Sequence, residues 1–244
     1  MTKKNIDCCF LVASNSSKSY QKLSKDYAAI EPPTWALLLA ESTRSVGFSV
    51  NILDANAEGL NEKQILKRVL NLNPKLICFV VYGQNVNAGT TNMSGAVYIA
   101  NYLKENKISI PIAFIGSHVQ ALPIETLKKE KSIDFVFTNE GVYALRNVLN
   151  LKSIQPESLE DIKGLAVRKN GKVSLNLPER VVPTEKMDID LPGYAWDLLP
   201  YKKRPLDLYR SPMWHAEYDF EKRSPYASIQ TSLGCQFKCS FCMI

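Results

Sequence analysis

Short apolar runs alternate with stretches of helical periodicity over the first 150 residues, and this alternation limits the fold more than any other feature of the sequence. The expected strands are residues 7–13, 49–54, 76–82, 111–116 and 134–138. The expected helices are residues 34–46, 62–72, 94–106, 123–130 and 142–149. Gly47 just after the first helix and Pro123 in the first turn of the fourth support these boundaries. Strands that alternate with helices predict an α/β fold, a doubly wound, five-stranded parallel sheet of the flavodoxin-like type.

The pattern changes after about residue 150. Residues 164–175 form an expected β-hairpin around Asn170-Gly171, because this dipeptide favours the tight turns of hairpins. A segment rich in proline and aromatic residues follows, and we interpret it as an ordered connector. Residues 226–233 alternate like a new strand. We therefore expect a first domain at 1–150, a connector at 151–224 and the start of another domain at 225–244.

Composition excludes several classes of protein. The net charge is +6, 45% of residues are hydrophobic and 22% are charged, as in an ordinary globular chain and unlike a disordered one. Basic and acidic residues are interspersed, so we expect no nucleic-acid partner. No apolar run is long enough to span a bilayer, and no signal peptide begins the sequence, so we expect a cytoplasmic protein without a membrane span.

The six cysteines fall into two groups. Cys8, Cys9 and Cys78 lie in expected strands, where free cysteine behaves as a small buried hydrophobe. The other three form a CxxxCxxC motif of Cys235, Cys239 and Cys242. Three thiolates at this spacing fit an iron-sulfur cluster with one iron left open, since such clusters usually take four cysteines.

Two alternatives stay open for the motif. A structural zinc site would need a fourth ligand, which His118 or His215 could supply only through the fold. A redox dithiol of Cys239 and Cys242 would leave Cys235 unexplained. No GxGxxG follows a strand and no GxxxxGK[ST] occurs, which argues against a nicotinamide site or a P-loop.

The end of the chain resembles the radical S-adenosylmethionine (SAM) enzymes. The resemblance lies in Thr231-Ser232-Leu233-Gly234, followed by CxxxCxxC with Phe241 before the third cysteine. It implies that Cys235, Cys239 and Cys242 hold a 4Fe-4S cluster whose open iron chelates SAM, with Phe241 close to SAM. In that family, electron transfer cleaves SAM to a 5'-deoxyadenosyl radical, so an electron donor such as flavodoxin or ferredoxin is implied.

The first 150 residues resemble the cobalamin-binding domain that precedes the barrel in one class of radical SAM enzymes. The matching segments are Glu31-Pro32-Pro33, residues 47–54, Gly116-Ser117-His118 and residues 134–141. Residues 162–166 and 191–197 resemble the connector of that class. The resemblance implies cobalamin as a cofactor. Cobalamin mutases place a histidine ligand after the first strand, but residues 13–18 contain none, so we expect cobalamin to bind base-off and without a protein histidine.

A doubly wound sheet of order 2-1-3-4-5 binds ligands beyond strands 1 and 3, where the winding reverses. Two long loops are expected there, at residues 14–33 and 83–92, and long loops in compact domains are usually functional. Gly116 would let a flat macrocycle approach closely. His118 can also be an ordinary loop residue, and Glu140 can simply complement a helix dipole. The expected cobalamin contacts are Ser14, Asn15, Gln84, Asn85, Thr90, Thr91, Gly116, Ser117, His118, Glu140 and Gly141.

The resulting hypothesis is the N-terminal part of a cobalamin-dependent radical SAM enzyme. Its parent is expected to be a methyltransferase acting on an unactivated carbon of a small molecule, natural product, lipid or saccharide. Two residues follow Cys242, so most of the barrel would lie beyond this chain, and the sequence identifies no catalytic residue. The alternatives are a flavodoxin-like cofactor-binding module without its own catalysis, a radical SAM enzyme that does not use cobalamin, and a zinc or redox protein.

Overall fold

The computed structural model describes residues 4–13, 29–82, 86–203, 208–211, 225–234 and 240. Its strands are β1 (Cys8–Val12), β2 (Val50–Asp54), β3 (Leu76–Val80), β4 (Ile112–Ile115), β5 (Phe135–Phe137), β6 (Leu165–Lys169) and β7 (Lys172–Leu175). Its α-helices are α3 (Thr34–Arg44), α4 (Glu62–Leu72), α5 (Val86–Glu105), α6 (Ser117–Ala121), α7 (Pro123–Lys129), α8 (Val142–Asn150), α9 (Pro156–Leu159) and α10 (Met187–Asp190). Short 3-10 helices are η2 (Thr184–Lys186), η3 (Trp196–Leu198) and η4 (Tyr201–Lys203).

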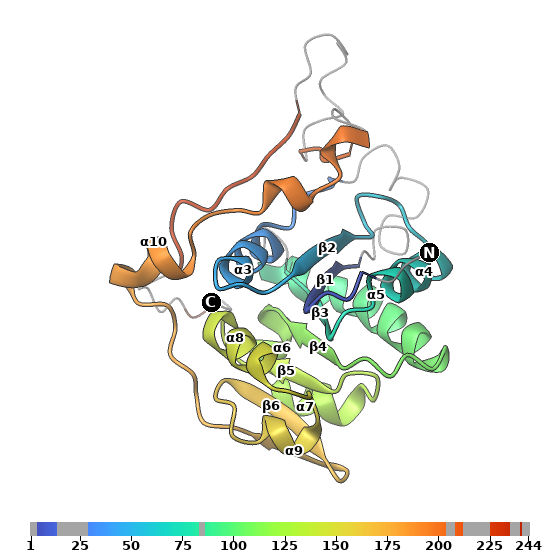
Figure 1. Ribbon diagram of the computed structural model, residues 1–244, viewed down its shortest axis with the longest axis vertical. Coiled ribbons are helices and arrows are strands. Elements are labelled where there is room, and N and C mark those ends of the chain that lie inside the picture. The colour runs from blue at the N-terminus through green and yellow to red at the C-terminus, as the bar shows by residue number, and fades with distance from the viewer. Residues whose placement is uncertain are drawn as a thin grey trace.

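The sheet has the predicted winding. Its order is β2-β1-β3-β4-β5-β6-β7, with the first five strands parallel, so the expected order 2-1-3-4-5 and the α/β fold class are confirmed (Figure 1). The hairpin also forms, with Asn170 at φ 50° and Gly171 at φ 75° in its turn. It pairs antiparallel with β5 and extends the same sheet, so the sheet continues past residue 150. The three domain boundaries stay predictions.

Two hydrophobic cores cover the two faces of the sheet. Phe10 and Cys78 face one core with α3 and α8, whereas Leu11 and Phe79 face the other with α4, α5 and α7. The alternation follows from the pleat, because successive side chains of a strand point to opposite faces. Figure 1 shows the helices on either side of the strands. None of the described helices is long and apolar enough to cross a membrane.

Two predicted elements differ from the structure. The expected loop at 83–92 is largely helix, because α5 begins at Val86. Asn, Gly and Thr are weak helix formers, but tertiary packing overrides propensity here: Gly89 lies against Ser117 and Val81, where an added Cβ would stand 2.3 Å from the Ser117 hydroxyl. The expected strand at 226–233 is wrong as well. Residues 225–234 carry no strand pairing, and the Gln230 amide donates instead to the Tyr194 hydroxyl.

The connector packs on the core that contains α3 and α8. Arg146 on α8 forms an ion pair with Asp190 on α10 and also donates to Ser42 on α3, so one guanidinium joins three helices. Arg44 on α3 pairs with Asp197 on η3 at 2.8 Å. Leu191, Ala195 and Leu199 are buried beside them. These contacts confirm an ordered connector over the part that the structure describes.

One buried carboxyl group gives a pH-dependent prediction. Asp54 ends β2, is 1% exposed and accepts a hydrogen bond from the Ala57 amide at 3.0 Å. Burial raises the pKa of Asp54 to about 6, above the value of about 3.9 for an unfolded chain. The protonated carboxyl group therefore contributes fully to the stability of the fold below pH about 4. This contribution is lost as the pH rises through about 6, because the buried group then ionises. The free energy of unfolding of Asp54→Asn, measured relative to that of wild type, should rise by roughly 2–3 kcal/mol as the pH is raised from 4 to 7.

Urea unfolding at four pH values across this range measures the effect. The exposed Asp188 on α10 supplies the matched control Asp188→Asn, whose difference from wild type should change little. A constant difference between Asp54→Asn and wild type would contradict the prediction.

Candidate functional site

The carboxyl ends of the parallel strands meet at one edge of the sheet, which is where open α/β sheets bind ligands. Tyr82 follows β3, Gln120 lies on α6 after β4, and Asn139 follows β5. The Gln120 side-chain amide donates to the Tyr82 hydroxyl and to the Asn139 carbonyl, the latter at 2.6 Å. The Asn139 side chain in turn accepts from the Gly141 amide at 2.9 Å. Neutral amides and a hydroxyl thus join the ends of three strands.

Trp35 closes this network from the other side. It lies in the first turn of α3, is 8% exposed, and its indole N–H donates to the Glu140 carbonyl at 3.1 Å. The rings of Trp35 and Tyr82 are tilted, with centroids 5.8 Å apart. Burial raises the pKa of Tyr82, so its hydroxyl stays protonated and serves as a hydrogen-bonding group at this edge.

Glu140 has structural partners among the described residues. Its carboxylate accepts a hydrogen bond from the Val182 amide, which fastens the connector to the end of β5. Burial raises the pKa of Glu140. Gly141 adopts φ 83° at the start of α8, where an added Cβ would meet Ile115 at 2.4 Å. Their expected cofactor contacts stay predictions.

Gly116 is needed for packing within the chain. An added Cβ would stand 2.2 Å from the Val81 carbonyl oxygen, so the turn after β4 lies directly against the backbone that leaves β3. The space next to its Cα hydrogens therefore belongs to Val81, and the reason given above for this glycine, room for a flat macrocycle, is wrong for that side of the residue. Ser117 follows it as the first residue of α6.

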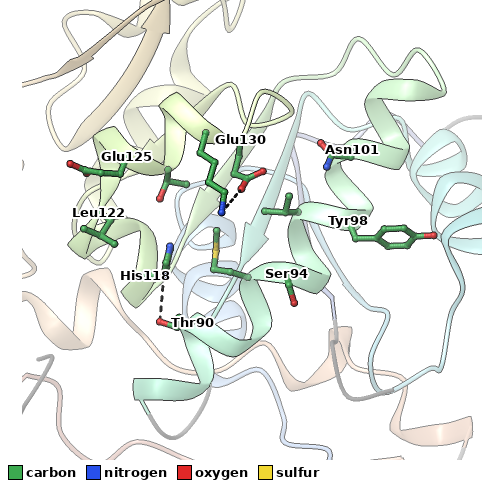
Figure 2. A pocket seen from close by; sticks show the side chains of 12 residues that line it. Thr90, Ser94, Tyr98, Asn101, His118, Leu122, Glu125 and Glu130 are labelled. Atoms are coloured by element: carbon green, nitrogen blue, oxygen red, sulfur yellow. Dashed lines mark hydrogen bonds and ion pairs between the residues drawn. The ribbon is translucent and has the colours of Figure 1, made fainter. Parts of the chain in front are cut away.

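His118 faces α5. Its Nδ1 atom lies 3.4 Å from the Thr90 hydroxyl, and both residues line a pocket of about 610 Å³ between α5 and α6–α7. Figure 2 shows His118 and Thr90 at one end of this pocket, with Tyr98 and Asn101 further along α5. Thr91 is exposed one residue beyond Thr90. Two of the predicted residues, Thr90 and His118, thus meet between α5 and α6.

The cysteines divide as expected where the structure describes them. Cys8, Cys9 and Cys78 are fully buried, and burial raises the pKa of the Cys9 thiol to about 12, so it stays protonated. Within the described ranges, no group of three or more His, Cys, Asp and Glu side chains could hold a metal ion. The predicted residues outside the described ranges are Cys235, Cys239, Cys242, Phe241, Ser14, Asn15, Gln84 and Asn85.

Sequence reasoning did not predict Trp35, Tyr82 and Asn139 as contacts at the edge. Tyr82 had a usable signal, because it is the last residue of an apolar run that ends in the polar residues 83–85. Gln120 is placed at the edge by its position after β4, on the five-residue helix α6. Trp35 lies in an expected helix, where its sequence position indicates a core residue and not a residue of the edge.

Comparison with known proteins adds to this geometry. The model of the B12 binding domain matches residues 23–149, which is more than half of the chain and includes β2 to β5 with the sheet edge described above. The chain belongs to the B12-binding domain family.

Two curated relatives extend the likeness beyond the B12-binding domain. A protein of Pyrococcus horikoshii named as an uncharacterised methyltransferase is 28% identical over 211 residues, which cover 86% of this chain and 40% of that protein. The anaerobic magnesium-protoporphyrin IX monomethyl ester cyclase of Synechocystis is 23% identical over 212 residues, 86% of this chain and 38% of the cyclase. The chain thus spans well under half the length of these curated relatives.

A solved structure shares the fold. The cobalamin-dependent SAM radical enzyme OxsB, determined with aqua-cobalamin and SAM bound, aligns with a TM-score of 0.57 and 19% identity over 79% of this chain and 24% of OxsB. The family match confirms the expected cobalamin-binding domain, and the likeness to OxsB shows a fold shared with part of a radical SAM enzyme that carries cobalamin.

The edge of this B12-binding domain fits a corrin ring chemically. Apart from Glu140, the edge groups joined above are neutral amides and hydroxyls, which can hydrogen-bond the amide side chains that fringe the ring. The Nδ1 atom of His118 contacts the Thr90 hydroxyl on α5, within the pocket between the helices. The expectation that cobalamin binds base-off and without a protein histidine stays a prediction.

The packing of Gly116 gives a second prediction. Gly116→Ala should destabilise the B12-binding domain by about 1–3 kcal/mol, because the new methyl group must displace the Val81 backbone. Gly47→Ala is the matched control, since Gly47 has φ 96° but no atom within 4 Å of an added Cβ, and carries the backbone strain alone. Thermal unfolding of both variants decides the point. Equal losses in Tm for the two variants would contradict the prediction, because the contact with Val81 would then add nothing to the backbone strain.

Proposed function

We propose that this chain forms the cobalamin- and cluster-binding part of a radical SAM enzyme, and that the whole enzyme is a methyltransferase acting on an unactivated carbon. One observation carries the proposal: a B12-binding domain at residues 23–149 precedes a CxxxCxxC motif at residues 235–242 in the same chain. The methyltransferase name of the Pyrococcus relative supports the reaction class.

When bound, SAM and its cluster would supply a radical that abstracts a substrate hydrogen, and cobalamin would supply the methyl group. The cluster would be held by Cys235, Cys239 and Cys242, whose thiolates are the ligand type that iron-sulfur clusters take. The amides of Gln120 and Asn139 are already oriented by the backbone and by Tyr82. Such preorganised groups bind a neutral, amide-rich ligand without having to be ordered first.

The first test is binding of cobalamin. Titration of the chain with hydroxocobalamin, followed by its visible spectrum, should show saturable binding with one site. Ser14→Trp should weaken binding at least tenfold if Ser14 contacts cobalamin as predicted, because a bulky ring then replaces a small hydroxyl group in the site. Lys67→Trp on the exposed face of α4 is the control and should bind like wild type.

A further variant checks the role of His118 in the same titration. His118→Ala should leave the spectrum of bound cobalamin unchanged, because the lack of a histidine in residues 13–18 predicts binding without a protein histidine. A changed spectrum would make His118 a cobalt ligand. Absence of any binding by wild type would overturn the cobalamin part of the proposal and favour a radical SAM enzyme that does not use cobalamin.

The second test concerns the cluster. Anaerobic reconstitution with iron and sulfide should load about four of each per chain, and Cys242→Ala should lose most of this loading. Cys78→Ala, which removes a thiol buried in β3, is the matched control and should keep the cluster. Zinc bound without sulfide would overturn the cluster assignment and favour a structural zinc site.

Ring formation is the second candidate reaction, because one relative is a cyclase. Transfer of a labelled methyl group from SAM to the product by the whole enzyme would favour methylation, and a product without the label would favour cyclisation.

A further inference from the structure

Four aromatic side chains of the connector form a continuous row, which we call the aromatic stack: Tyr194, Trp196, Tyr201 and Tyr209. Successive ring centroids are 5.3, 6.4 and 5.0 Å apart. Tyr194 and Trp196 are stacked, and the other two pairs are tilted, as aromatic rings prefer. The row brings together Tyr194, the first residues of η3 and η4, and the segment 208–211.

One end of the aromatic stack is fixed to the sheet. Tyr209 is fully buried, and its hydroxyl donates to Asp54 at the end of β2 at a distance of 2.8 Å. The neighbouring residue Arg210 forms two backbone hydrogen bonds with Ile30, at 3.0 and 2.9 Å, so this segment is paired with the chain that leads into α3. Both attachments lie at the carboxyl edge, where the parallel strands end.

The other end holds the segment 225–234. The Tyr194 hydroxyl accepts from the Gln230 amide at 2.7 Å and donates to the Gln230 carbonyl at 3.1 Å. The Tyr201 hydroxyl donates to the Tyr226 carbonyl at 3.0 Å. This segment has no strand partner within the described ranges, so tyrosine side chains satisfy backbone groups that a sheet would otherwise satisfy.

We infer that Tyr209 is a positioning residue: by fixing the aromatic stack to Asp54, it sets where the segment 225–234 lies relative to the carboxyl edge of the sheet. Cys235 follows this segment directly. The inference rests on the proposed function for what the cysteines and the edge hold. On that basis, the aromatic stack holds the segment from which the cysteine motif continues.

Hydrogen exchange followed by mass spectrometry tests the inference on the chain without cofactors. Tyr209→Phe keeps the ring but removes the hydroxyl that binds Asp54. We expect the amides of 225–234 to exchange roughly five- to tenfold faster, as the loss of one buried hydrogen bond implies. The amides of β1 to β5 should exchange as in wild type. Tyr201→Phe, which releases the Tyr226 carbonyl, should act in the same direction and serves as the second variant.

Tyr143→Phe is the matched control. The Tyr143 hydroxyl donates to Asp190 at 2.7 Å, a tyrosine–carboxylate bond of similar length that joins α8 to α10. Its loss should leave exchange in 225–234 unchanged. Unchanged exchange of this segment in Tyr209→Phe would overturn the inference. Faster exchange throughout β1 to β5 would also overturn it, because Tyr209 would then stabilise the whole fold instead of positioning one segment.

The two proposals fail in different ways. Failure of wild type to bind cobalamin overturns the proposed function, yet the exchange measurement remains readable because it needs no cofactor. A normal cobalamin titration with no exchange effect in Tyr209→Phe overturns the positioning role alone.

Discussion

Burial of both faces of the parallel sheet is the constraint on which the other features depend. Strands β1 and β3 each have alternate side chains buried in two separate cores, so helices must cover both faces of the sheet. Covering both faces requires a crossover after every strand, and crossovers return each strand in the same direction. All five parallel strands therefore end at one edge, and the polar groups that follow them meet there. The hydrogen bonds from Gln120 to Tyr82 and Asn139 are a result of this winding.

Contacts between backbones set how closely the segments at that edge approach. Gly89 of α5 and Gly116 after β4 both lie against Val81, and neither position has room for a side chain. This closeness brings α5 next to α6 and places Thr90 opposite His118. The pocket between the helices lies beside the sheet edge but has a different lining. Met93 and Val97 line the pocket together with polar side chains, whereas amides join the edge.

Elements with a strong local signal could be predicted from the sequence, and those that depend on tertiary contact could not. The helix at 62–72 was predicted to the residue because Asn61 and Gln64 form a capping box at its start. The first turns of α5 were not, since Asn87, Gly89 and Thr90 favour other conformations and become helical through packing on Val81 and Ser117. Segment 226–233 has the alternation of a strand, but a strand also needs a partner, and pattern alone cannot supply one.

The site shows the same division. Gly116, Ser117 and Glu140 were located by their positions after β4 and β5, which topology fixes. The residues that contact them could not be predicted in this way. The contacts of Glu140 with Val182 and of Gly116 with Val81 join segments about 35 to 42 positions apart in the sequence. Trp35 and Tyr82 likewise gain their places at the edge from each other, across more than 40 positions.

The bridge between Ile30 and Arg210 has a consequence for the order of folding. It joins residues 180 positions apart, counted as 210 minus 30, and the closure of so long a loop is entropically unfavourable until the structure between its ends exists. A chain emerging from the ribosome can complete β1 to β7 before Tyr209 is synthesised, since domains form as units from the N-terminus. During that interval the Asp54 carboxyl group lacks the hydrogen bond that the Tyr209 hydroxyl donates in the complete fold.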